Sequence, residues 1–210
     1  MKLYWFQVAP NPTKVRLYIA EKIAGGAAIE VEGVVVKLSK GEQRSPAHRA
    51  RNPFESLPVL ELDDGSTIVE SLAIIDYLED MVPLPPMWGL EPRERARARE
   101  MERVVEQRLL NPLIAYVHAT NSPTGQPPNA QVAQWAASAW PAALWYLDQR
   151  LADGRAYLLG ETVSVADCTL AAALQFARFA KVPLLEGLDA LAHWDAVYRE
   201  RPVARLVLSL

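Results

Sequence analysis

The stretch that decides the fold runs from Leu57 to Ser71 and reads LPVLELDDGSTIVES. Residues 59–62 are a short apolar run, and residues 67–69 form a second run of strand-forming side chains. Between them, Asp63-Asp64-Gly65 has the composition of a tight turn. Two such runs joined by a turn predict a β-hairpin.

The residues around this hairpin extend the pattern. Residues 2–6 and 29–38 predict two more strands, and residues 15–23 between them place apolar side chains at helical spacing. Gly25-Gly26 ends that helix, and residues 72–80 after the hairpin predict another helix with one apolar face. This order of elements predicts an α/β unit with a mixed sheet.

The chain divides into two parts. Residues 1–80 carry the α/β pattern, whereas residues 81–92 contain four prolines and one glycine, which excludes a helix and predicts a linker. Residues 93–210 are helical in pattern throughout. Within them, residues 130–151 predict a long helix that Pro141 kinks or breaks. We therefore expect an α/β domain before the linker and an all-α bundle after it.

The composition narrows the functional classes. With 22 basic and 25 acidic residues the net charge is −3, which argues against a nucleic-acid partner. No apolar run approaches the roughly 20 residues that span a bilayer, so no membrane partner is expected. Cys168 is the sole cysteine and the three histidines lie far apart in the sequence, so we expect neither a disulfide framework nor a metal site. Any sulfur chemistry must then use a thiol from another molecule.

The pair Leu57-Pro58 leads into the first strand of the hairpin. Proline is tolerated at the start of a strand, and a cis bond costs little before proline. A cis Pro58 would turn the backbone N–H and C=O of Leu57 outward, where an extended peptide could pair with them. A trans proline in a loop explains the motif equally well.

Two predicted helices begin at residues that could bind a ligand. Ser71 caps the helix after the hairpin, where free N–H groups attract an anion, and Glu70 beside it could pair with an ammonium group. Such a site suits an amino-acid head group, although plain capping also explains it. Asn11 and Thr13 lie in the turn into the first helix, where ligands bind in α/β units. A helix cap between two prolines is the alternative interpretation.

A fourth motif is structural. Ser164 and Asp167 have the spacing of a capping box, with Val163 and Cys168 at the positions of a hydrophobic staple. This interpretation makes Cys168 a small packing residue beside a helix start.

Together, these motifs resemble the cytosolic glutathione transferases, in a bacterial form with the pattern APNP-x-KVR. The resemblance rests on APNPTKVR at residues 9–16, KGEQRSP at 40–46, NPFESLPVLELDDG at 52–65, Glu70-Ser71 and SVAD at 164–167. It covers nearly the whole chain. It implies a thioredoxin-like N-terminal domain, an all-α C-terminal helical-bundle domain, a homodimer and a cytoplasmic location.

The resemblance also implies a site for glutathione as co-substrate, without a metal. Glu70-Ser71 should hold the γ-glutamyl group, and Leu57 should pair with the cysteinyl backbone next to a cis Pro58. Gln43 and Arg44 fall where the family often binds the glycyl carboxylate.

The hydroxyl that normally activates the thiol is missing, because its usual positions hold Ala9 and Phe6. Asn11 matches the position where bacterial members that resemble the Nu class use asparagine. We therefore expect the Asn11 amide to stabilise the thiolate, with Thr13 as the second choice of donor.

The leading hypothesis is an enzyme that stabilises the glutathione thiolate for attack on a small-molecule electrophile, or for disulfide or peroxide reduction. Ala9, Glu55 and Ser56 replace family-typical residues and motivate an alternative, a glutathione-transferase-like binding protein without turnover. Helix phase around an expected break at Pro112 predicts an electrophile pocket formed by Arg103, Gln107, Asn111 and Tyr116.

Overall fold

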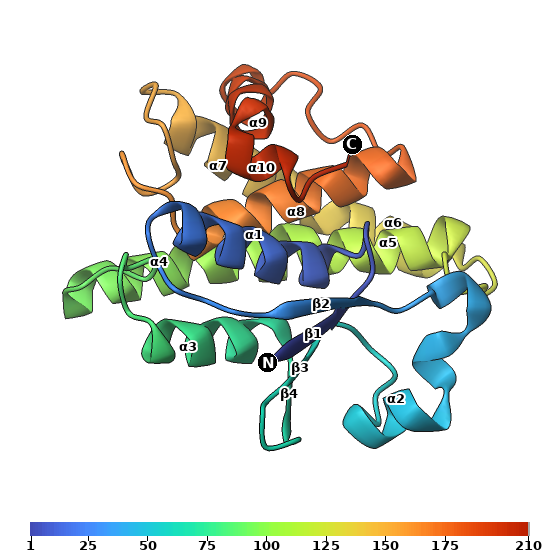
Figure 1. Cartoon of the computed structure of the whole chain (residues 1–210). Coiled ribbons are helices and arrows are strands. Elements are labelled where there is room, and N and C mark those ends of the chain that lie inside the picture. Colours follow the sequence, from blue (N-terminus) through green and yellow to red (C-terminus); the bar gives the residue numbers. More distant parts are fainter. Residues whose placement is uncertain (210) are drawn as a thin grey trace.

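The computed structural model describes residues 1–209, which form an α/β part followed by a helical part (Figure 1). The elements of the first part are β1 (Lys2–Trp5), α1 (Pro10–Ala24), β2 (Glu32–Val35), two short 3-10 turns (Leu38–Lys40 and Glu42–Arg44), α2 (Pro46–Arg51), β3 (Val59–Glu61), β4 (Thr67–Val69) and α3 (Ser71–Met81). Those of the second part are α4 (Pro92–Val105), a π-helical segment (Glu106–Leu110), α5 (Asn111–Asn121), α6 (Ala130–Ala139), α7 (Pro141–Leu151), α8 (Val165–Ala180), α9 (Asp189–Glu200) and α10 (Pro202–Arg205).

The strands form one sheet in the order β2-β1-β3-β4. β1 runs parallel to β2, and β3 runs antiparallel to both β1 and β4. The register pairs Trp5 with Val35, Tyr4 with Val59, and Val59 with Val69. The C-terminal ends of β1, β2 and β4 and the start of β3 therefore lie at the same end of the sheet.

The predicted mixed sheet is confirmed, with strands shorter than expected. Of the predicted strand 29–38 only Glu32–Val35 pairs as a strand, because the chain turns into a 3-10 helix from Leu38 onward. α1 ends at Ala24, as Gly25-Gly26 predicted. The Leu57–Pro58 bond is cis, as the family resemblance implied.

The two prolines expected to interrupt the helices behave differently. Pro112 does not break its helix, because α4 continues through the π-helical segment into α5 as one long rod (Figure 1). A proline ring clashes with the carbonyl four residues earlier in an α-helix, and the wider π turn moves that carbonyl aside. Pro141 does produce the predicted break, between α6 and α7.

Residues 82–91 of the predicted linker lie outside helices, because α3 extends to Met81 and α4 begins at Pro92. Leu210, the last residue of the predicted helical domain, lies outside the described residues. Among residues 1–209 no helix is both long and apolar enough to cross a bilayer.

α1 joins the two parts of the chain. It packs against α3 and also against α8, and Figure 1 shows it between the sheet and α8. Val15 and Leu60 belong to the same apolar core cluster as Leu109 and Leu170. Buried contacts therefore hold the α/β part against the helical part.

A buried charge cluster lies where α1 meets α4. The Nζ of the fully buried Lys14 is 3.3 Å from Glu106 Oε2 and 3.6 Å from Glu102 Oε1. Arg103 donates to both carboxylates, and the Thr169 hydroxyl donates to Glu102 at 3.2 Å. Burial lowers the pKa of Lys14 from 10.5 to about 8, although the attraction of Glu102 acts in the opposite direction.

The Lys14 shift predicts how stability changes with pH. Because the folded pKa lies below the unfolded one, the unfolded chain binds more protons between about pH 8 and pH 10.5, so stability rises with pH there. At about 1.4 kcal/mol for each pKa unit, wild type should gain about 3 kcal/mol relative to Lys14→Met over this range. Urea unfolding of both proteins at the two ends of the range measures the difference. Parallel pH profiles would contradict the prediction.

Candidate functional site

Four segments meet at the sheet end where β1, β2 and β4 finish and β3 begins. The first turn of α1, which follows β1, carries Asn11, and the segment after β2 carries Gln43. Leu57 precedes β3, and Glu70-Ser71 follows β4. The register of the sheet therefore brings these predicted site residues to one end of the fold.

The backbone of Leu57 has no hydrogen-bonding partner among residues 1–209. The segment before it is held firmly, since His48 Nε2 and Asn52 Nδ2 donate to Ser56 O at 3.1 and 2.9 Å. A fixed residue with a free N–H and C=O beside a strand can pair with a peptide as an added strand.

Glu70 is the N-cap of α3, and Ser71 is the first helical residue rather than the predicted cap. Glu70 has a φ of 72°, which is uncommon for a residue with a side chain and costs on the order of 1–3 kcal/mol. Its exposed carboxylate makes no capping bond and no ion pair within the described chain. This arrangement leaves a carboxylate free to bind a cationic group beside the start of a helix.

Gln43 and Arg44 lie in the second 3-10 turn. Gln43 is buried, and its Oε1 has no hydrogen-bonding partner within residues 1–209, so it could accept a bond from a ligand. Arg44 is exposed, with its Nε 3.7 Å from a Glu55 carboxylate oxygen. Exposed ion pairs are weak, so Arg44 remains able to bind an anion.

A hollow of about 160 Å³, called the interdomain hollow below, lies beside Leu57 between the two parts of the chain. Apart from Asn11, His118 and Thr124 its walls are apolar, and three phenylalanines contribute to them. The lining residues are Phe6, Val8, Ala9, Pro10, Asn11, Leu38, Leu57, Ile114, His118, Pro123, Thr124, Phe176 and Phe179.

Of the two predicted thiol donors, only Asn11 lines the interdomain hollow. Its Oδ1 is buried without a hydrogen-bonding partner in the described chain. Thr13 is fully buried, and its hydroxyl donates to Ala9 O at 2.9 Å and accepts from Gln175 Nε2 at 3.3 Å. Because these internal bonds occupy the Thr13 hydroxyl, the second choice of donor does not fit the structure.

His118 lines the interdomain hollow and was not selected from the sequence. Its Nδ1 lies 2.7 Å from Gln126 Oε1 and 3.1 Å from Ser122 Oγ. An amide oxygen only accepts hydrogen bonds, so Nδ1 carries the proton, and in the neutral ring Nε2 is left as an acceptor. Among the described residues that line the hollow, His118 is the one whose side chain can take up and release a proton.

The residues predicted for an electrophile pocket do not line the interdomain hollow: they are Arg103, Gln107, Asn111 and Tyr116. Arg103 is bonded to carboxylates of its own helix, and Gln107 and Asn111 are exposed. The Tyr116 ring packs edge-on against Trp140, with 5.3 Å between the ring centroids.

The residues of this long helix that do line the interdomain hollow are Ile114 and His118, which lie one α-helical turn apart on α5. Tyr116 lies between them in sequence and therefore points to a different side of the helix.

The capping box at the start of α8 is confirmed. Asp167 Oδ2 accepts from the backbone N–H of Ser164 at 2.9 Å and from its hydroxyl at 2.7 Å. Cys168 is fully buried, and burial raises the pKa of its thiol well above the usual value. A buried, protonated thiol is a packing group and not a nucleophile.

Two family models, described as the N-terminal and the C-terminal domain of glutathione S-transferase, match residues 3–86 and 92–198. The chain belongs to the glutathione S-transferase family. The family expectation and the thioredoxin-like fold with a helical C-terminal part are thereby confirmed. Membership of this family makes the function a glutathione-dependent transfer or isomerisation.

Named relatives span the whole chain. "Glutathione S-transferase 2" of Saccharomyces cerevisiae is 32% identical and aligns with 100% of this chain and 90% of its own length. "Maleylpyruvate isomerase" of a Ralstonia species is 30% identical, over 98% of each chain. A glutathione S-transferase domain-containing protein of Marinobacter aquaeolei is similar in structure, with a TM-score of 0.84, 37% identity, and coverage of 97% of this chain and 100% of its own.

Proposed function

We propose that this protein is a glutathione transferase that conjugates the glutathione thiolate to small, apolar electrophiles. The observation that carries the proposal is the free Leu57 backbone at the rim of the interdomain hollow. A peptide paired with Leu57 would place a cysteine side chain beside the hollow, within the reach of groups from both parts of the chain.

The remaining site residues fit the two ends of glutathione. The free Glu70 carboxylate and the start of α3 match the ammonium and carboxylate of a γ-glutamyl group. Gln43, with its unpaired buried oxygen, and the exposed Arg44 lie on the other segment of the same sheet end, where they can bind the glycyl portion.

The interdomain hollow supplies two groups for the thiol. Asn11 can donate its amide N–H to the thiolate, and such a bond to a charged group contributes about 1.5–3 kcal/mol. Asparagine cannot take up the proton at neutral pH, whereas His118 Nε2 has a lone pair and can accept it, directly or through a water molecule. Asn11 is therefore assigned to stabilise the thiolate, and His118 to accept the proton.

The walls of the hollow favour conjugation over isomerisation. Relatives named for maleylpyruvate and maleylacetoacetate act on acids, which need cationic partners. No lysine or arginine is among the residues that line the interdomain hollow within the described chain. Phe6, Phe176 and Phe179 provide aromatic walls, and cavities of about 150 Å³ hold a single benzene ring.

The proposal includes a homodimer in the cytoplasm, with domains at 1–80 and 93–210. Large apolar side chains on the surface support a partner interface: Phe54 is 73% exposed, Trp135 65% and Trp145 62%. A hollow of about 210 Å³ between the π-helical segment and α7 gives such a side chain a place to dock.

The test is turnover of chlorodinitrobenzene with glutathione, with the conjugate identified by mass spectrometry. We expect conjugate from wild type and, within about twofold, from Cys168→Ala, because the buried protein thiol takes no part. Glutathione binding without turnover of this or any other neutral electrophile would favour the binding-protein alternative. Isomerisation of a maleyl acid without any conjugation would overturn the assignment of the reaction.

A further inference from the structure

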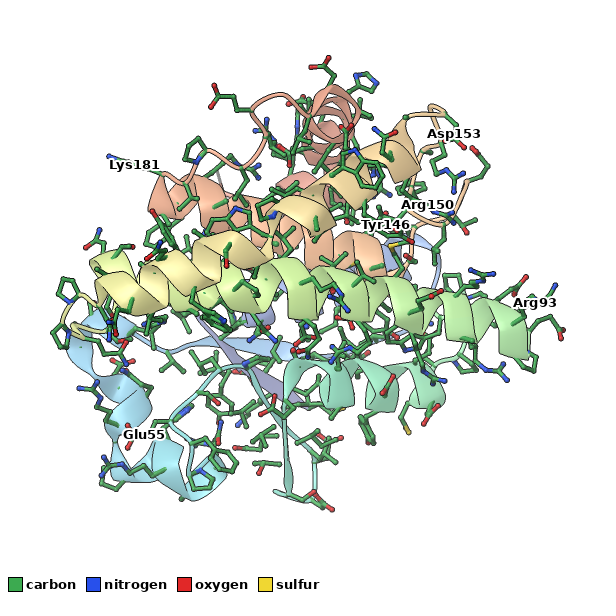
Figure 2. All side chains as sticks on the ribbon, turned by 180° about the vertical axis from the view of Figure 1, so that it is seen from behind. Glu55, Arg93, Tyr146, Arg150, Asp153 and Lys181 are labelled. Carbon is green, nitrogen blue, oxygen red and sulfur yellow. The ribbon has the colours of Figure 1, made fainter. Side chains whose placement is uncertain are left out.

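A second cavity, of about 580 Å³, lies at the other end of the molecule from the interdomain hollow and shares no lining residue with it. It is open to solvent on one side and is lined by the linker residues 86–90, the first turns of α4, the end of α7 and the segment before α8. In Figure 2, Arg93 and Arg150 lie toward one end of the molecule, and Lys181 and Glu55 lie toward the other. Below it is called the arginine cavity.

Three guanidinium groups line the arginine cavity: Arg93 and Arg97, one turn apart on α4, and Arg150 on α7. The carboxylate among the lining residues is Glu94, which is already engaged, because it accepts from the backbone N–H groups of Leu90 and Glu91 at 3.0 and 3.1 Å. The lining therefore has a net positive charge, with its carboxylate directed into the helix cap.

The three arginines keep most of their donors free. Arg93 makes no hydrogen bond or ion pair with any described residue. Arg150 uses Nε to bond Leu158 O at 3.2 Å, and Arg97 has an exposed, long contact of 3.6 Å with Glu100. A guanidinium group without a close carboxylate partner, such as that of Arg93, binds an anion readily.

Much of the remaining lining of the arginine cavity is apolar. Met87 and Trp88, which are 3% and 4% exposed overall, contribute to it together with Leu90, Leu159 and Val163. The volume lies in the range typical of small-molecule sites, which combine apolar walls with a few placed polar groups. A lining that combines apolar side chains with three guanidinium groups matches a ligand with an apolar body and one anionic group.

We propose that the arginine cavity is a second ligand site, which binds small aromatic anions: phosphate, sulfonate or carboxylate groups on an apolar ring. The site is separate from glutathione chemistry and does not depend on the proposed function. The anionic group of the bound ligand contacts the arginines, and the ring of the ligand lies against Leu90 and Val163.

Calorimetric titration tests the proposal, with naphthyl phosphate, naphthalene sulfonate, neutral naphthol and inorganic phosphate as probes. The two aromatic anions should each bind at least about tenfold more tightly than naphthol or inorganic phosphate. The triple variant Arg93→Gln, Arg97→Gln, Arg150→Gln should lose about tenfold in affinity for both aromatic anions, and naphthol binding should not change. Comparison of the phosphate with the sulfonate shows which anionic group the site prefers.

Two single variants and a control accompany the triple variant. Arg150→Gln alone should lose about threefold, and Leu90→Ser should weaken the aromatic anions without affecting inorganic phosphate. Arg205→Gln, which alters an exposed, ion-paired arginine elsewhere, should bind like wild type. Wild-type affinity in the arginine variants, or inorganic phosphate bound as tightly as naphthyl phosphate, would overturn the proposal.

Discussion

Glu70→Ala is expected to weaken glutathione binding by about 100-fold, because it removes a charged hydrogen-bond partner of about 2–3 kcal/mol. The Glu70 side chain makes no internal bond within the described residues, so its loss should leave the free energy of unfolding nearly unchanged. Retention on immobilised glutathione and calorimetric titration both measure the effect. At saturating glutathione the turnover number should recover, since Glu70 binds the co-substrate and does not touch the reacting atoms.

Two variants separate charge from position. Glu70→Gln keeps the shape and part of the hydrogen bonding, so its affinity should lie between those of wild type and Glu70→Ala. Glu32→Ala is the matched control, an exposed glutamate at the opposite end of the sheet, paired in register with Lys2. Equal losses from Glu70→Ala and Glu32→Ala would mean that net charge, and not the site, determines affinity.

The α/β part and the start of α8 could be predicted from the sequence because their signals are local. A hairpin turn, a pair of glycines after α1 and a capping box before α8 each depend on residues a few positions apart, and all three are present. The convergence of the site residues follows from the strand order β2-β1-β3-β4 and its register, which the structure supplies and the sequence pattern did not.

The helical side of the site depends on long-range packing and could not be predicted in the same way. The packing of α8 on α1 decides whether the Thr13 hydroxyl points into the hollow or toward Gln175. Thr13 and Gln175, which form a hydrogen bond, are 162 positions apart in the sequence. His118 lines the hollow because the α5 helix packs beside α8, and that packing is not marked by any local sequence signal.

Asn11→Ala is expected to raise the pKa of the bound glutathione thiol by about 1–2 units, because the lost hydrogen bond contributes about 1.5–3 kcal/mol and one unit corresponds to about 1.4 kcal/mol. At a pH at least one unit below the wild-type pKa of the bound thiol, the thiolate fraction, and with it kcat/KM for chlorodinitrobenzene, should fall by about 10- to 100-fold. Above about pH 8.5 the loss should shrink, since the thiol of wild type and variant then ionises without help. Ultraviolet absorbance of the bound thiolate against pH measures the pKa directly.

His118→Gln distinguishes the two roles within the same hollow. Glutamine cannot accept the proton, so this variant should lower kcat while glutathione affinity stays near that of wild type. Asn11→Ala acts on the stability of the thiolate, so its loss should follow the thiol pKa, and raising the pH should rescue it. If Asn11→Ala leaves the thiol pKa unchanged, the amide does not donate to the thiolate, and the nearby backbone N–H groups at the start of α1 must stabilise it instead.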